Sequence, residues 1–120
     1  MSQPERPTIL FIIASDPRTS HRPAEAIRVA AGVGVWKRAD VIVYFSGPAI
    51  LALGEWVDEL KEDDNYTRYL PLLAELGRPF LVPLGAPELM ELGETQFRIE
   101  SISESSLAKL AMGANSIHRF

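Results

Sequence analysis

The chain has 120 residues, of which 47% are hydrophobic and 23% are charged, which is the composition of a folded globular protein rather than of a disordered one. Sixteen acidic and twelve basic side chains give a net charge of −4, which argues against sequence-independent binding to nucleic acid. The sequence contains no cysteine, and this excludes disulfides, thiolate metal sites and cysteine nucleophiles on this chain.

The start of the sequence lacks the basic residues, the long apolar stretch and the small-residue cleavage site of a signal peptide. The longest apolar run, residues 9–14, is far shorter than the roughly 20 residues that a membrane-spanning helix needs. We therefore expect a cytoplasmic protein that does not associate with membranes. Because no repeat, low-complexity tract or linker-like change of composition interrupts the chain, we expect residues 1–120 to form a single domain.

Unbroken apolar blocks predict the strands of the first half. Residues 8–14 and 41–45 are almost continuously apolar, and residues 80–82 form a shorter block of the same kind. Strands with both faces buried have this pattern, which favours a parallel sheet covered by helices. Between the first two blocks, residues 23–37 place apolar side chains at helical spacing, and Pro23 suits the first turn of that helix.

The middle of the chain is less regular. Residues 49–53 predict a short helix, residues 55–64 an acidic solvated surface, and residues 66–76 a helix with Tyr69, Leu72, Leu73 and Leu76 on its inward face. Pro71 fits that helix only near the first turn, because proline lacks the N–H that a helix interior needs. Gly77 is expected to end the helix.

The C-terminal part is predicted to complete the sheet. Residues 96–99 alternate like an edge strand, Ser103 suits the N-cap of a helix over residues 104–112, and residues 115–120 are a candidate fifth strand. Since strands alternate with helices along the chain, the sequence predicts an α/β three-layer sandwich.

Three loops are the candidate ligand-binding segments. In open parallel sheets, ligands bind beyond the carboxyl ends of the strands, which selects residues 15–22, 46–48 and 83–87. The first loop offers a carboxylate, a guanidinium, a hydroxyl and an imidazole, which together suit an anionic ligand or proton transfer. Each of these residue types also has an ordinary structural role, as a turn former, a helix cap or a solvated charge. The candidate ligand-binding residues are Ser15, Asp16, Arg18, Ser20, His21, Ser46, Gly47 and Gly85.

Known catalytic and cofactor motifs are missing from the sequence. Gly32 and Gly34 lack the third glycine of a dinucleotide-binding loop, and no Walker phosphate loop follows a predicted strand. The two histidines stand near opposite ends of the chain, and the acidic stretch lacks the spacing and glycine of a calcium loop. Ser46 lacks the surrounding glycines of a hydrolase nucleophile elbow. We therefore expect no metal and no cofactor, and catalytic residues stay unassigned.

The order of these segments resembles the DsrE/DsrF-like family of small α/β proteins. A first strand with a small polar loop at residues 9–15, an Ala-rich helix, the strand that starts at Asp40, and residues 72–77 and 80–82 carry the resemblance, which covers nearly the whole chain. It implies a three-layer α/β/α sandwich around a five-stranded, mainly parallel sheet, and assembly into homo- or hetero-oligomers such as trimers or hexamers. Sulfur-carrying members hold a persulfide on a cysteine just after the third main strand, near residues 83–85 here. No cysteine stands there, so the resemblance implies fold and assembly but not persulfide transfer.

Three hypotheses about function follow. The favoured one is a non-catalytic, DsrE-like oligomeric protein that binds a partner or a small anionic ligand at the loops after the parallel strands. Its protein partners would be further copies of itself or related subunits; residues 50–53 beside Trp56 are either such an interface or part of the core, and an exposed Trp56 would favour the interface. The alternatives are a small-molecule enzyme that uses Asp16, His21 and Ser46, and a nucleotide-binding module of flavodoxin-like architecture.

Overall fold

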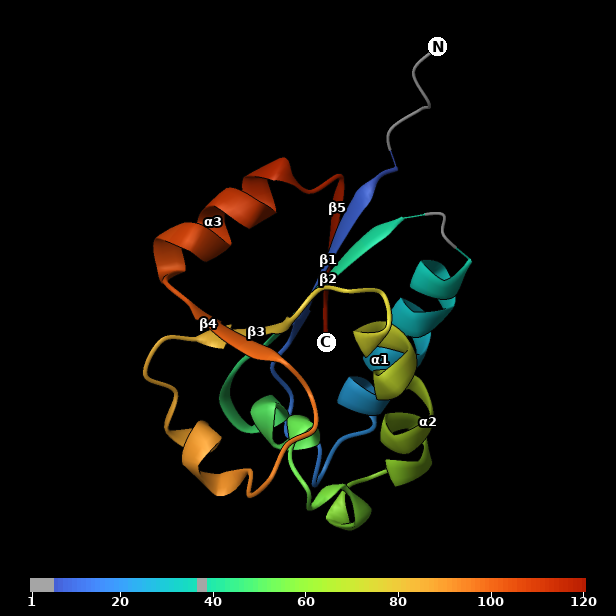
Figure 1. Ribbon diagram of the computed structural model, residues 1–120, viewed down its shortest axis with the longest axis vertical. Helices are drawn as coiled ribbons and strands as arrows, with labels where there is room; N and C mark the ends of the chain where they lie inside the picture. The colour runs from blue at the N-terminus through green and yellow to red at the C-terminus, as the bar shows by residue number, and fades with distance from the viewer. Residues whose placement is uncertain (1–5, 37–38) are drawn as a thin grey trace.

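The computed structural model describes residues 6–36 and 39–120, which form a five-stranded parallel sheet with the strand order β4-β3-β2-β1-β5 (Figure 1). The strands are β1 (Thr8–Ile13), β2 (Asp40–Phe45), β3 (Phe80–Pro83), β4 (Ile99–Ile102) and β5 (Ser116–Arg119). The helices are α1 (Arg22–Val35), α2 (Asp63–Ala74) and α3 (Glu104–Gly113), with three short 3-10 helices, η1 (Gly47–Leu53), η2 (Val57–Glu59) and η3 (Pro87–Glu91).

The helices cover both faces of the sheet, which confirms the α/β/α sandwich. Helices α1 and α2 lie on one face and α3 lies on the other (Figure 1). The strand order explains this division: the chain proceeds from β1 outward to β4 and then returns through α3 to β5 on the far edge. Because crossovers between parallel strands are right-handed, reversing their direction along the sheet moves the connecting helix to the opposite face.

Apolar side chains on alternate strand positions build two cores. The larger core lies under α1 and α2 and includes the fully buried Phe11 and Phe45. The smaller core contains Leu10, Ile42, Tyr44 and Leu81, against which α3 packs Leu107, Leu110 and Ala111. Both faces of β1 and β2 are therefore buried, which is why these strands lack polar alternation. Residues 49–53 also belong to the larger core, so this segment is not the interface that the sequence left open.

Helix α2 differs from its prediction. It begins at Asp63 instead of residue 66, and Pro71 lies in its interior rather than near its first turn. Its buried residues are Tyr66, Leu70 and Leu73, whereas Leu72 and Leu76 are exposed. The buried set recurs at spacings of four and three residues, so Tyr66, at the edge of the acidic stretch, fixes which face of the helix turns inward.

The edge strand β4 also differs from its prediction. It starts at Ile99, which pairs with Phe80, so residues 96–98 precede the strand instead of forming most of it. Phe97 packs edge-to-face on Phe80 with the ring centroids 5.5 Å apart. That contact holds Phe97 against the core although it lies outside the strand. The apolar residue that suggested a strand therefore packs on the core from a loop.

Candidate functional site

The three loops predicted from the sequence lie together at the carboxyl end of the sheet, at the bottom of Figure 1. The Ser46 amide donates to the Ile13 carbonyl (2.9 Å) and thereby joins the ends of β2 and β1. The Lys61 amide donates to the Pro17 carbonyl (2.9 Å), and the Leu84 amide donates to the Ile102 carbonyl (3.0 Å). We call residues 14–21, 46–48, 54–62 and 84–94 the carboxyl-end surface.

Asp16 is bound by its neighbour Arg18. The carboxylate accepts hydrogen bonds from Arg18 Nε (3.0 Å), Arg18 Nη2 (2.9 Å) and the Arg18 backbone amide (2.9 Å). Those bonds from the Arg18 side chain, with its charge, hold the pKa of Asp16 below its usual range. Asp16 is therefore an ionised turn residue, and its geometry suits a structural anchor better than a proton donor.

The other polar side chains of the first loop also bind within the chain. His21 Nδ1 lies 3.3 Å from Glu62 Oε1, with both side chains about half exposed or more. Ser20 Oγ accepts a hydrogen bond from the Arg22 amide (3.1 Å), and Ser15 Oγ donates to the Phe120 carbonyl oxygen (2.9 Å). Ser15, Ser20 and His21 therefore each make a contact within the chain. Such contacts fit the structural roles that the sequence left open as the alternative to ligand binding.

The two candidate glycines serve the backbone of the second and third loops. Gly47 and Gly85 have φ values of +56° and +71°, a left-handed conformation that favours glycine. Ser46 precedes η1, and its side chain forms no capping hydrogen bond. Within residues 6–36 and 39–120, no hydrogen bond joins any two of Asp16, His21 and Ser46. The three side chains share one end of the sheet, but their contacts lead to other residues.

Large apolar side chains are exposed on this carboxyl-end surface. Trp56, Leu84 and Met90 are 54%, 63% and 91% exposed, respectively. Their supporting segments are held by backbone contacts: the Glu55 amide donates to the Leu92 carbonyl (3.0 Å), which ties the end of η1 to the end of η3. Of the three side chains, the sequence indicated only Trp56, because Leu84 and Met90 have no pattern that separates an exposed loop residue from a buried one.

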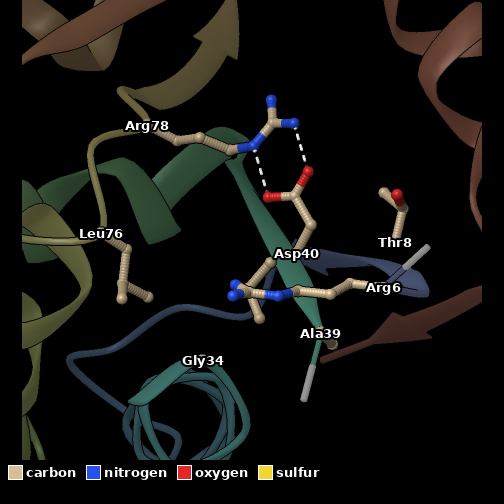
Figure 2. Close-up of a pocket in the computed structure, with 8 residues that line it drawn as sticks. Arg6, Thr8, Gly34, Ala39, Asp40, Leu76 and Arg78 are labelled. Atoms are coloured by element: carbon tan, nitrogen blue, oxygen red, sulfur yellow. Dashed lines mark hydrogen bonds and ion pairs between the residues drawn. The ribbon is translucent and has the colours of Figure 1, made fainter. Parts of the chain in front are cut away.

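A pocket that the sequence did not predict lies at the opposite, amino end of the sheet (Figure 2). Its volume is about 480 Å³, within the range of small-molecule sites. Its polar lining consists of Arg6, Thr8, Asp40 and Arg78, and its apolar lining of Gly34, Ala39, Val41 and Leu76.

One carboxylate and two guanidinium groups set the charge of this pocket. Asp40 is bound through both oxygens by Arg78, whose Nε lies 2.8 Å from Asp40 Oδ1. Hydrogen bonds and charge from Arg78, with a smaller effect of the Arg6 charge, lower the pKa of Asp40. Asp40 begins β2 and Arg78 stands just before β3. The sequence feature that could have predicted this ion pair is the presence of opposite charges at the starts of two consecutive parallel strands. Predicting the pair from that feature also requires knowing that β2 and β3 are neighbours in the sheet.

Across the described residues, no group of three or more His, Asp or Glu side chains is placed to hold a metal ion. Among the same residues, no helix has both the length and the apolar character that crossing a membrane requires.

Comparison with known proteins shows the fold. No protein-family model and no curated protein sequence matches this chain. Among solved structures, the ychN protein from E. coli is similar with a TM-score of 0.75 at 15% sequence identity, and the match covers 95% of this chain and 99% of that one. An identity this low carries information about architecture only. The chain therefore has the DsrE-like α/β fold, built on a five-stranded parallel sheet.

Proposed function

We propose that this chain is a non-catalytic binding protein that assembles with further copies of itself through the carboxyl-end surface. The observation that carries this proposal is the exposure of Trp56, Leu84 and Met90 on that surface. Tryptophan and methionine are enriched in protein interfaces, and tryptophan is a frequent energetic anchor there. Large apolar side chains are also exposed elsewhere on the chain, Trp36 and Met112 among them, and what supports an interface here is that Trp56, Leu84 and Met90 share the end of the sheet that holds the loops after the parallel strands.

The polar side chains of the same surface support binding over catalysis. A general acid or base must be free to reach a substrate proton and must change its protonation state near neutral pH. Asp16 is held ionised by Arg18, and His21 faces Glu62. Within the described residues, no hydrogen bond joins Asp16, His21 and Ser46 to one another, so their contacts do not favour a catalytic set of these three side chains.

The segment after β3 supports the same conclusion. The resemblance to DsrE/DsrF-like proteins places the sulfur-carrying residue near residues 83–85. This chain has Pro83, Leu84 and Gly85 there, and Leu84 is mostly exposed. An apolar side chain at this position can contact a protein partner but cannot carry sulfur. We therefore propose that this segment binds a partner at the position where a carrier protein would hold its persulfide.

Light scattering on matched tryptophan variants tests the assembly. We expect the wild-type protein to elute as an oligomer at micromolar concentration, and we expect Trp56→Ser to dissociate it. Trp36→Ser is the matched control, because Trp36 is even more exposed but lies at the end of α1, outside the carboxyl-end surface. A wild-type monomer, or equal dissociation by the two variants, would contradict the proposed interface.

Intact-mass measurement tests the absence of sulfur transfer. After incubation with a persulfide donor and removal of the excess, we expect an unchanged mass, because no side chain of the sequence forms a stable persulfide. Stable addition of sulfur at a defined residue would refute the non-catalytic assignment, whatever the oligomeric state proves to be.

A further inference from the structure

The amino-end pocket contains more positive charge than its ion pair requires. Arg78 binds Asp40 through two nitrogens, so these two side chains neutralise each other. Within residues 6–36 and 39–120, Arg6 forms no ion pair, although its charge is close enough to lower the pKa of Asp40. The described residues that line the pocket therefore carry a net formal charge of about +1, on a chain whose net charge is −4.

The position of Arg6 suits a ligand contact. Figure 2 shows its side chain extended across the pocket, with the guanidinium on the side where Leu76 and Gly34 lie. The hydroxyl of Thr8 also lines the pocket and forms no hydrogen bond with a described residue. A guanidinium binds a carboxylate through two parallel hydrogen bonds, so Arg6 provides a strong and directional contact for such a group.

One wall of the pocket, beside the Arg6 guanidinium, is apolar, and its shape depends on the absence of a side chain at Gly34. Gly34 lies where α1 passes the end of α2, and a Cβ added there would lie 2.5 Å from Leu76 Cδ1. With glycine at this position, the side chain of Leu76 lies directly over the helix backbone and lines the pocket together with Ala39 and Val41. A short apolar group bound beside Arg6 would be covered by these side chains.

A purely structural role explains only part of this arrangement. An ion pair between Asp40 and Arg78 that links the starts of β2 and β3 needs neither the second arginine nor the apolar wall. We propose that the amino-end pocket binds a small organic monocarboxylate, whose charged end pairs with Arg6 and whose short apolar part lies against Leu76. A singly charged carboxylate matches the net charge of the pocket, whereas a phosphate monoester carries almost twice that charge. This site is separate from the carboxyl-end surface and does not depend on the proposed assembly.

Titration of the wild-type protein with hexanoate, followed by the backbone amide resonances of Gly34 and Asp40, tests the site. We expect saturable shifts with a dissociation constant of about 1 mM, an ordinary affinity for a ligand of this size. Acetate, which lacks the apolar chain, and hexanol, which lacks the charge, should each bind at least about tenfold more weakly. Absence of saturable shifts up to about 10 mM hexanoate, ten times that constant, would overturn the proposal.

Three variants separate the parts of the site. Arg6→Gln should weaken hexanoate binding about tenfold or more, and Leu76→Ala should weaken hexanoate but leave acetate unchanged. Arg68→Gln is the matched control, because it removes the same charge from the exposed surface of α2, outside the pocket lining, and should bind like wild type. Both pocket residues are exposed, so their replacement spares the core. Equal weakening by Arg6→Gln and Arg68→Gln would show a general charge effect and would overturn the site.

Discussion

Replacing Tyr66 with phenylalanine should stabilise the protein. Tyr66 lies in the first turns of α2 and is 1% exposed, and its hydroxyl has no hydrogen-bond partner among the described residues. A buried polar group without a partner costs about 1–3 kcal/mol. Phenylalanine keeps the ring and its packing and loses only the contacts of one oxygen, a few tenths of a kcal/mol. We therefore expect the free energy of unfolding to rise by about 1 kcal/mol.

Urea denaturation followed by circular dichroism measures this change. Thermal denaturation is a second measurement of the same change. An unfolding entropy of about 2 cal/mol/K per residue converts 1 kcal/mol into a Tm increase of about 4 °C for a chain of this length. Tyr69→Phe on the same helix is the matched control, because Tyr69 is only partly buried and should change stability by less than about 0.5 kcal/mol. A loss of stability in Tyr66→Phe would refute the reasoning, because it would mean that the hydroxyl has a partner.

The pH dependence provides a second check on the same residue. Burial, with the negative charge of Glu62, raises the pKa of Tyr66 above its ordinary value of 10. The folded state therefore keeps the phenol protonated at a pH where the unfolded state releases the proton. The contribution of this group to stability is full below pH 10 and is lost as the pH rises above 10. We expect the stability difference between Tyr66→Phe and wild type to grow above pH 10; a constant difference would contradict the burial of the phenol.

Three further substitutions test other contacts of the fold. Gly54→Ala should destabilise the protein by about 1–3 kcal/mol in urea denaturation, because the added Cβ would lie 2.6 Å from the Leu92 carbonyl oxygen. The clash is with backbone, which cannot move aside as the end of a flexible side chain can. Unchanged stability would mean that η1 and η3 can move apart without cost. Ser103→Ala should cost about 1 kcal/mol by removing the Oγ that accepts a hydrogen bond from the Ser106 amide (3.1 Å), whereas Ser105→Ala on the exposed side of α3 should not. Pro71→Ala should raise the thermal midpoint, because alanine restores an N–H donor inside α2, and a lower midpoint would show that the proline is needed where it lies.

The sequence predicted the parts of the fold that depend on local pattern. The apolar blocks located β1 and β2 to within one residue, and Ser103 was identified as the cap of α3, because these features follow from burial and capping alone. The inward face of α2 was correct for Leu73 and the partly buried Tyr69 and wrong for Leu72 and Leu76. Tyr66 was missed because it adjoins an acidic stretch, and only tertiary packing reveals that it is buried. The start of β4 was wrong because it is decided by pairing with β3, a contact between distant residues.

The same division holds for the two candidate sites. The rule for parallel sheets predicted which loops share the carboxyl end, and Figure 1 shows that they do. It did not predict how their side chains pair, since the contact between His21 and Glu62 joins segments far apart in the sequence. The amino-end pocket was missed because Arg6, Asp40 and Arg78 come together only through the order of the strands.

Tryptophan emission from a protein with one tryptophan tests the central claim most directly. In Trp36→Phe the remaining Trp56 reports on the carboxyl-end surface, and in Trp56→Phe the remaining Trp36 reports on the end of α1. If copies of this chain assemble through the carboxyl-end surface, Trp56 should emit at shorter wavelength at high protein concentration and shift to longer wavelength on dilution, while Trp36 should not change. Emission from Trp56 that is independent of concentration, or a shift confined to Trp36, would contradict the account.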